Sequence, residues 1–158
     1  MIVPDNEFGH TVVVDVLLFA SDEVVIVLRR LVAYQELILV RLEATKGRTA
    51  DDEEWHRALG LRSPQLASRQ GISQTEAERH ALRVALRDGA GNETAFEEQR
   101  SGGGQGRLHA AFAVKPWASS AVTLVVTWDV WGVTATYELP TAAVGKARAQ
   151  PNPVWTRT

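Results

Sequence analysis

The fold is decided by the stretch from Ala121 to Leu139, AVTLVVTWDVWGVTATYEL. Its first half places on one face Val122, Leu124, Val126 and Trp128. After the turn at 129–132, the alternation resumes with Val133, Ala135, Tyr137 and Leu139 on one face. Such period-2 alternation of β-branched and aromatic residues is typical of a half-buried strand. Because Gly132 can adopt the positive φ that a short hairpin loop needs, the stretch predicts a β-hairpin with one face toward water.

Similar patterns elsewhere predict about seven or eight strands in all. The longer segments with strand character are 11–19, 24–31, 36–43, 82–86 and 107–114. The region around Tyr34 and Gln35 has neither Gly nor Pro, so two strands or one long bent strand are both compatible with 24–43. The segment 141–149 fits a helical turn or a last strand, and the tail beyond it, with Pro151 and Pro153, is expected to be irregular.

Residues 44–79 interrupt the strand pattern with helix signals. Thr49 and Asp52 have the spacing of a capping box, Ser63 before Pro64 predicts a helix start, and Ser73 to Glu76 is a second capping box. We expect one to three short helices, inserted into the sandwich because the segment is too small to carry a core of its own. The prediction is a single domain, 1–158, that is all-β: an immunoglobulin-like antiparallel two-sheet sandwich with a helical insertion at 44–79.

Composition excludes several classes of function. The chain of 158 residues has a net charge of −2, which gives no electrostatic reason to bind nucleic acid or an anionic membrane. It has no cysteine, so disulfides, thiolate catalysis and cysteine-based zinc sites are excluded. The first ten residues lack the features of a signal peptide, and no apolar run approaches about 18 residues. We therefore expect a cytoplasmic protein without a membrane segment.

The run Val24 to Leu42, VVIVLRRLVAYQELILVRL, and the hairpin containing Trp128 and Gly132 resemble an uncharacterised family of bacterial β-sandwich proteins from high-GC genomes. In that family a V-x-L…A-Y…V-R-L pattern precedes a variable middle segment and a tryptophan-containing hairpin. The turn after Tyr34 departs from the pattern, since the family tends to have Pro and Gly there. The resemblance implies the fold and transfers no activity, cofactor or site residue.

The motifs that carry chemistry in other proteins are incomplete here. The glycine-rich segment 101–106 lacks the lysine and the following helix of a phosphate-binding loop, so we interpret it as a flexible interstrand loop. The four histidines, His10, His56, His80 and His109, do not have the spacing of a metal-binding motif. A metal site would have to be assembled by the fold, with carboxylates such as Asp15 or Asp88 as further ligands. Of the histidines, His80 and His109 are expected near strand starts and are candidates to converge. No catalytic, cofactor-binding or metal-ligating residue is therefore predicted.

Asp15 is the most conspicuous carboxylate, because it lies within the apolar segment 11–19. A buried carboxylate has a raised pKa, as catalytic acids do. More often such a residue binds an arginine or backbone amide, or protects a strand from edge pairing. The arginines nearby in the pattern are interspersed with acidic residues and fit an ordinary solvated sheet face; they are Arg29, Arg30, Arg41, Arg83 and Arg87.

Two tryptophans are candidates for an interaction surface. Parity places Trp128 in the core and leaves Trp131 in the turn, at least partly exposed. Exposed tryptophans are enriched in binding hot spots, which also favours Trp117 beside Pro116. The alternative is that these loop tryptophans fold back over the end of the sandwich.

The first three strands carry more apolar side chains than one sheet face can bury. After the core set is assigned, there remain Val13, Leu17, Phe19, Val25, Val27, Leu37 and Leu39. Because soluble monomers rarely expose large apolar patches, we expect a homodimer through this face, with the insertion at its rim. The predicted function is a non-enzymatic protein-interaction or structural module whose contact residues include Val25, Val27, Leu37 and Leu39. The alternative is a small-molecule binder or hydrolytic enzyme with a site between the insertion and the sheet.

Overall fold

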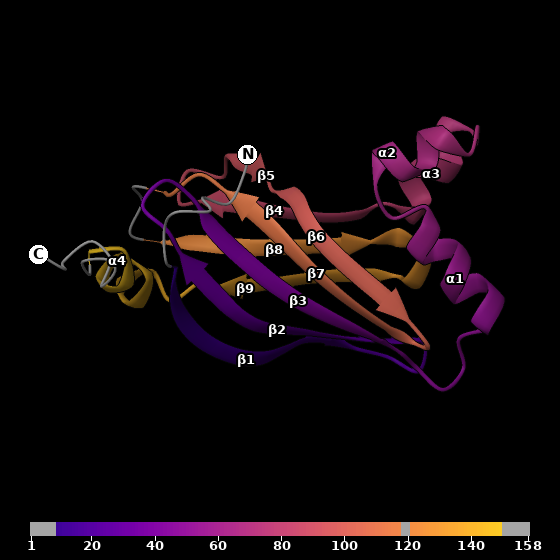
Figure 1. Ribbon diagram of the computed structural model, residues 1–158, viewed down its shortest axis with the longest axis horizontal. Helices are drawn as coiled ribbons and strands as arrows, with labels where there is room; N and C mark the ends of the chain where they lie inside the picture. The colour runs from indigo at the N-terminus through magenta and orange to yellow at the C-terminus, as the bar shows by residue number, and fades with distance from the viewer. Residues whose placement is uncertain (1–8, 118–120, 150–158) are drawn as a thin grey trace, which may run out of the picture.

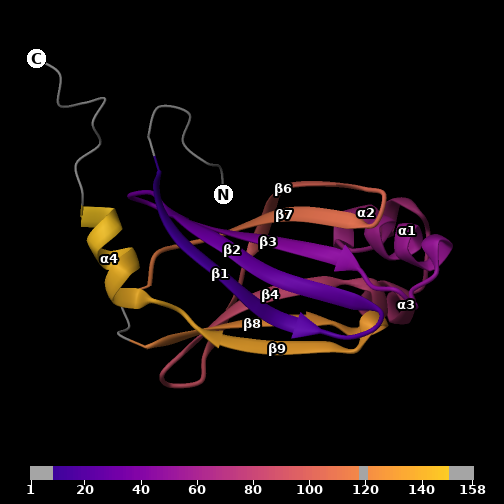
Figure 2. The same ribbon diagram turned by 90° about the horizontal axis from the view of Figure 1, so that it is seen from below.

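The computed structural model describes residues 9–117 and 121–149, and within them nine strands form two facing antiparallel sheets (Figures 1 and 2). Sheet A contains, in order across the sheet, β1 (His10–Ala20), β2 (Val24–Ala33), β3 (Ile38–Lys46), β7 (Arg107–Val114) and β6 (Glu97–Gly104). Sheet B contains β5 (Glu93–Ala95), β4 (Leu82–Asp88), β8 (Val122–Trp128) and β9 (Val133–Glu138). The predicted all-β two-sheet sandwich with a helical insertion is confirmed.

Helices close both ends of the sandwich (Figure 2). The insertion between β3 and β4 forms α1 (Asp52–Gly60), α2 (Pro64–Arg69) and α3 (Gln74–His80) at one end. At the opposite end lies α4 (Thr141–Ala149), so 141–149 is a helix and not a last strand. Because β3 continues to Lys46, the insertion begins two to three residues later than the composition change at residue 44 predicts.

The helix starts follow capping chemistry. The predicted caps Ser63 and Ser73 are confirmed, since each hydroxyl accepts from the backbone N–H three residues on. The predicted cap at Thr49 is wrong: Asp51 caps α1, its carboxylate accepting from the N–H of Glu54 at 3.2 Å. A carboxylate at this position also interacts favourably with the positive end of the helix dipole, which explains why it displaces threonine.

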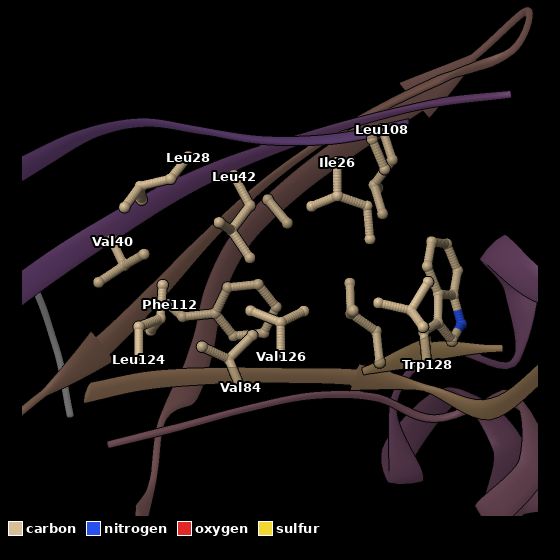
Figure 3. Packing of buried hydrophobic residues seen from close by; sticks show 14 of the residues in the cluster. Ile26, Leu28, Val40, Leu42, Val84, Leu108, Phe112, Leu124, Val126 and Trp128 are labelled. Atoms are coloured by element: carbon tan, nitrogen blue, oxygen red, sulfur yellow. The ribbon is translucent and has the colours of Figure 1, made fainter. Parts of the chain in front are cut away.

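The main core lies between the two sheets (Figure 3). Sheet A contributes inward side chains that include Ile26, Leu28, Val40, Leu42, Leu108 and Phe112. Sheet B faces them with Val84, Leu124, Val126 and Trp128. These are the inward sets that the alternation predicts in β2, in β3 and in the hairpin. Fully burying one such aliphatic side chain contributes about 1.5–3 kcal/mol, so the core supplies the principal stabilisation of the sandwich.

Of the two alternatives for residues 24–43, two strands are correct, and the interpretation of the glycine-rich segment as a loop is wrong for most of its length. The chain does not continue as one bent strand past Tyr34; it turns, with the Tyr34 N–H donating to the Leu37 carbonyl at 2.9 Å. The glycine-rich segment is not an interstrand loop, because Gly102 to Gly104 belong to β6 and pair with β7. A Cβ at Gly103 would lie 2.9 Å from the Arg107 carbonyl oxygen, so the strand needs glycine at this close approach.

Candidate functional site

The outer face of sheet A carries an ion-paired cluster at two strand irregularities. The β1–β2 register shifts between Val13 and Val16, where Asp15 has a positive φ of 48°. Arg29 is the extra residue of β2 where its register with β3 shifts. The Arg29 guanidinium lies 3.2 Å from the Asp15 carboxylate and 3.0 Å from that of Glu43. Asp15 is therefore an exposed carboxylate that pairs with an arginine at a bulge, and not a buried acid.

This cluster has a defined electrostatic effect. The hydrogen bond from Arg29 holds the pKa of the Glu43 carboxyl below its ordinary value, while burial opposes the shift. In turn, the hydrogen bonds to Glu43 and then Asp15 raise the pKa of Arg29. His109 lies near the same carboxylate, with Nδ1 3.8 Å from Glu43 Oε2. The cluster therefore consists of one guanidinium that holds two carboxylates, with an imidazole beside them.

Three further arginines form a row across the same face. In the strand register Arg30 lies opposite Arg41, Arg41 opposite Ala111, and Ala111 opposite Arg100. Neighbouring strands are about 4.8 Å apart, so Arg30 and Arg41 are adjacent like charges. Within residues 9–117 and 121–149, none of the three side chains has a hydrogen bond or ion pair, and the Nε atom of Arg41 is buried without a partner.

The arginine row borders a hollow of about 540 Å³. Ala111 and Gly102 line it where larger side chains would fill the space, and His109 adds an imidazole at its edge. Four arginines and two carboxylates line the hollow, so it has an excess of two positive charges in a chain whose net charge is −2. We call this feature the arginine hollow.

The five arginines interpreted from the sequence as part of a solvated sheet face are divided between the two sheets. Arg83 and Arg87 project from β4 in sheet B and are paired, with Asp129 at 3.0 Å and Glu93 at 2.8 Å. They fit the solvated-face interpretation, whereas Arg30 and Arg41 do not. Arg100 had no signal in the sequence, because its strand is polar and glycine-rich and only strand pairing places it in the row.

The apolar face predicted for β1, β2 and β3 divides into a buried and an exposed part. Leu37 and Leu39 are buried in a second cluster, together with Val32, Ala111, Ala113 and the half-buried Tyr34. Phe19 turns inward after a second register shift in β1 and packs against the main core. Val25 and Val27 are half-buried. The exposed large apolar side chains in the described residues are Val13 at 72% and Leu17 at 59%.

The insertion does not cover that face. Its Trp55 and Leu59 join the main core at the end of the sandwich, and Leu61 is buried there as well. The sequence pattern does not indicate which end of the strands the helices close. Covering by the insertion is thus excluded for Val13 and Leu17, which stay exposed.

The prediction for Trp131 is wrong, and the fold-back alternative is correct. Trp131 is only 3% exposed, because the turn forms a short 3₁₀ helix, η1 (Asp129–Trp131), and Gly132 with φ 66° reverses the chain. The ring lies 6.0 Å from Trp55 and 6.5 Å from Trp128 between centroids, and the latter two rings are 5.9 Å apart. We call these three residues the tryptophan cluster; it joins the insertion to the sandwich. Trp117 is half-buried and packs against the main core.

The histidines do not form a metal centre. His80 is the last residue of α3, not a strand start, and is buried with Nδ1 2.9 Å from the Glu76 carbonyl oxygen. His109 lies on the exposed face of β7, so the two do not converge. In the part of the chain that the structure describes, no group of three or more His, Asp or Glu residues is arranged to hold a metal ion.

A second hollow, of about 1220 Å³, lies where the insertion meets β4, β5 and β6. Its position corresponds to the site between the insertion and the sheet that a small-molecule binder or hydrolytic enzyme would use. Arg62 at its wall donates to the Leu59 carbonyl, to Glu98 at 3.2 Å and to the Ser101 hydroxyl. The Ser63 hydroxyl caps α2. No histidine is among the described residues that line this hollow, so neither serine has an imidazole base there.

Comparison of the chain with protein-family models, with curated proteins and with solved structures finds no match. None of the helices in the described residues is long and apolar enough to cross a membrane.

Proposed function

We propose that this protein is a non-enzymatic interaction module that self-associates through the outer face of β1 and β2. The observation that carries the proposal is the exposure of Val13 and Leu17 on one face of an edge strand. Half-buried Val25 and Val27 on β2 extend the apolar surface beside them. Contiguous apolar surface of this kind marks interaction sites, whereas isolated exposed residues do not.

The geometry favours a face-to-face contact with a second copy over pairing of strand edges. The register shift and positive φ at Asp15 interrupt the edge of β1, and a charged residue there discourages addition of another strand. An isologous contact must be self-complementary. The surface places apolar side chains beside charges of both signs, since Val13 lies opposite Arg30 and two positions from Asp15.

Light scattering on a sizing column at micromolar concentration tests the self-association. The chain mass is 17.3 kDa, and we expect about twice that value. Leu17→Glu is expected to give a monomer, since it places an unpaired charge in the contact. Leu39→Glu, the variant suggested by sequence alone, is unsuitable because Leu39 is only 3% exposed and the change would damage the fold.

Thr136→Glu is the matched control, because Thr136 is exposed on β9 in the other sheet. It introduces the same charge on a strand without touching the proposed contact, and is expected to leave the mass unchanged. A wild-type mass equal to one chain, or dissociation by both variants alike, would refute the proposal.

We also propose that the sandwich is immunoglobulin-like, as the sequence analysis expected. The order β2–β3–β7–β6 corresponds to strands A, B, E and D of an immunoglobulin domain, and β5–β4–β8–β9 corresponds to C′, C, F and G. In this correspondence β1 is an additional edge strand and α1 to α3 are inserted between strands B and C. An experimental structure with a different strand order would overturn it.

The second hollow favours one alternative function, the binding of a small molecule between the insertion and the sheet. Its wall includes both Arg62 and Arg69 from the insertion and Arg87 from β4. Screening small molecules by thermal shift, with Arg69→Gln as the variant, distinguishes this function from self-association. A hit that Arg69→Gln weakens and Leu17→Glu does not affect would support it.

A further inference from the structure

We propose that the arginine hollow binds the phosphate group of a small ligand. The site is formed by Arg30, Arg41 and Arg100, which β2, β3 and β6 bring to one row around Ala111. The hollow adjoins the surface proposed for self-association and shares Val13 and Arg30 with it. The inference rests on the unpaired arginines alone and does not depend on that contact.

The first argument is the unrelieved charge of the row. Arg30 and Arg41 are direct cross-strand neighbours, and like charges in this arrangement are destabilising. Their neighbour Arg29 is neutralised by two carboxylates on the same face. Elsewhere on the sheets, Arg83 and Arg87 each have a carboxylate partner. The guanidiniums of the row therefore repel one another, whereas carboxylates neutralise the other arginines of these sheets named above. A bound anion would remove this repulsion.

The second argument is the state of the Arg41 guanidinium. Its Nε is buried without a hydrogen-bond partner, although a buried donor left unpaired is unfavourable. Arg41 is the middle member of the row and lines the hollow. An oxyanion in the hollow would supply an acceptor to the Arg41 guanidinium, whose Nε has none among the described residues.

The third argument is the shape and size of the space. Ala111 separates Arg41 from Arg100 in the row, so the guanidiniums surround a recess and do not fill it. A volume of about 540 Å³ is in the range of pockets for small organic ligands. Because both ends of the row are exposed arginines, the ligand has access from solvent.

Phosphate fits this donor set better than a single carboxylate does. Each guanidinium presents a planar fork of N–H donors that matches a pair of oxygen atoms. A terminal phosphate offers three oxygens and about two negative charges, which correspond to three unpaired arginines and to the excess of two positive charges in the lining. A carboxylate has two oxygens and one charge, so it would leave part of the row unsatisfied.

The test measures binding of inorganic phosphate and inorganic pyrophosphate to the full chain by isothermal titration calorimetry, with thermal melts in parallel. Sodium chloride of equal ionic strength corrects for general screening. We expect saturable binding with one site per chain and a higher melting temperature in pyrophosphate than in chloride. Acetate serves as the single-carboxylate probe and is expected to bind more weakly than inorganic phosphate.

Arg41→Met is the principal variant. It is expected to weaken pyrophosphate binding at least about tenfold, since charge-assisted bidentate bonds are the strong ones. It should also raise the melting temperature of the ligand-free protein, because it removes a like-charge contact and an unpaired buried donor. A purely structural arginine would show the opposite effect on stability. Arg41→Lys keeps the charge and loses the fork, so intermediate affinity is expected.

Arg100→Gln, at an exposed position of β6, is the second variant if Arg41→Met fails to fold. Arg79→Gln on α3 is the control, since it removes an exposed arginine far from the row in the fold and should not change binding. Measuring the monomerising variant Leu17→Glu as well separates anion binding from self-association. The proposal is overturned by absence of saturable binding, by equal affinities of Arg100→Gln and wild type, or by binding of acetate in preference to inorganic phosphate.

Discussion

The tryptophan cluster provides the sharpest test of the packing described above, through the three variants Trp55→Phe, Trp128→Phe and Trp131→Phe. All three side chains are at most 3% exposed, and their rings contact one another. Each substitution removes a similar volume and keeps an aromatic ring. The variants differ in one respect, the hydrogen bond of the indole N–H.

Only Trp128 has a partner for that group among the described residues: its Nε1 donates to the His80 carbonyl oxygen at 3.0 Å. The Nε1 atoms of Trp55 and Trp131 are buried without a partner. Trp128→Phe therefore strands a buried carbonyl, at a penalty of about 1–3 kcal/mol. Trp55→Phe and Trp131→Phe instead remove an unsatisfied donor, which offsets part of the lost packing. We expect Trp128→Phe to destabilise the protein by about 1–3 kcal/mol more than either of the others.

Urea unfolding followed by far-ultraviolet circular dichroism measures these differences without relying on tryptophan emission. Trp131→Ala is the companion variant and is expected to cost about 3–5 kcal/mol, as truncation of a core aromatic does. Equal losses for the three phenylalanine variants would show that the Trp128 hydrogen bond has no special weight. A negligible loss for Trp131→Ala would show that η1 does not fold onto the cluster.

Three further predictions concern other parts of the molecule. Glu43→Gln should lower the urea midpoint at neutral pH, because the hydrogen bond from Arg29 lowers the folded pKa of Glu43 and so stabilises the folded state. This stabilisation is fully present above the ordinary pKa of 4.5 and is lost as the pH falls through the folded pKa. The variant and the wild type should therefore have the same midpoint in acid. Gly47→Ala should destabilise by about 1–3 kcal/mol, since its Cβ would lie 2.2 Å from the Asp22 carbonyl oxygen, whereas Gly104→Ala has open space and should change little. EDTA or zinc should leave the melting temperature unchanged. A clear metal-dependent shift would contradict the prediction that the protein has no stabilising metal site.

The candidate site was less accessible to sequence reasoning than the fold. Asp15 and Arg29 lie fourteen positions apart, and two register shifts bring them together. A sequence pattern does not specify where a bulge occurs, although a single bulge changes which face every later residue occupies. For the same reason Phe19 was assigned to the outer face, whereas the structure packs it against the core.

What the sequence by itself determined was the local structure: the alternation in β8 and β9, the inward sets of β2 and β3, and the serine caps of α2 and α3. These follow from interactions between residues close in the chain, so the pattern and the geometry coincide. Only the tertiary structure decided that Trp131 folds onto Trp55, and that Arg100 completes a row with Arg30 and Arg41. Those contacts join residues tens of positions apart. Which of these residues meet depends on strand order and helix docking, and local preferences do not encode either.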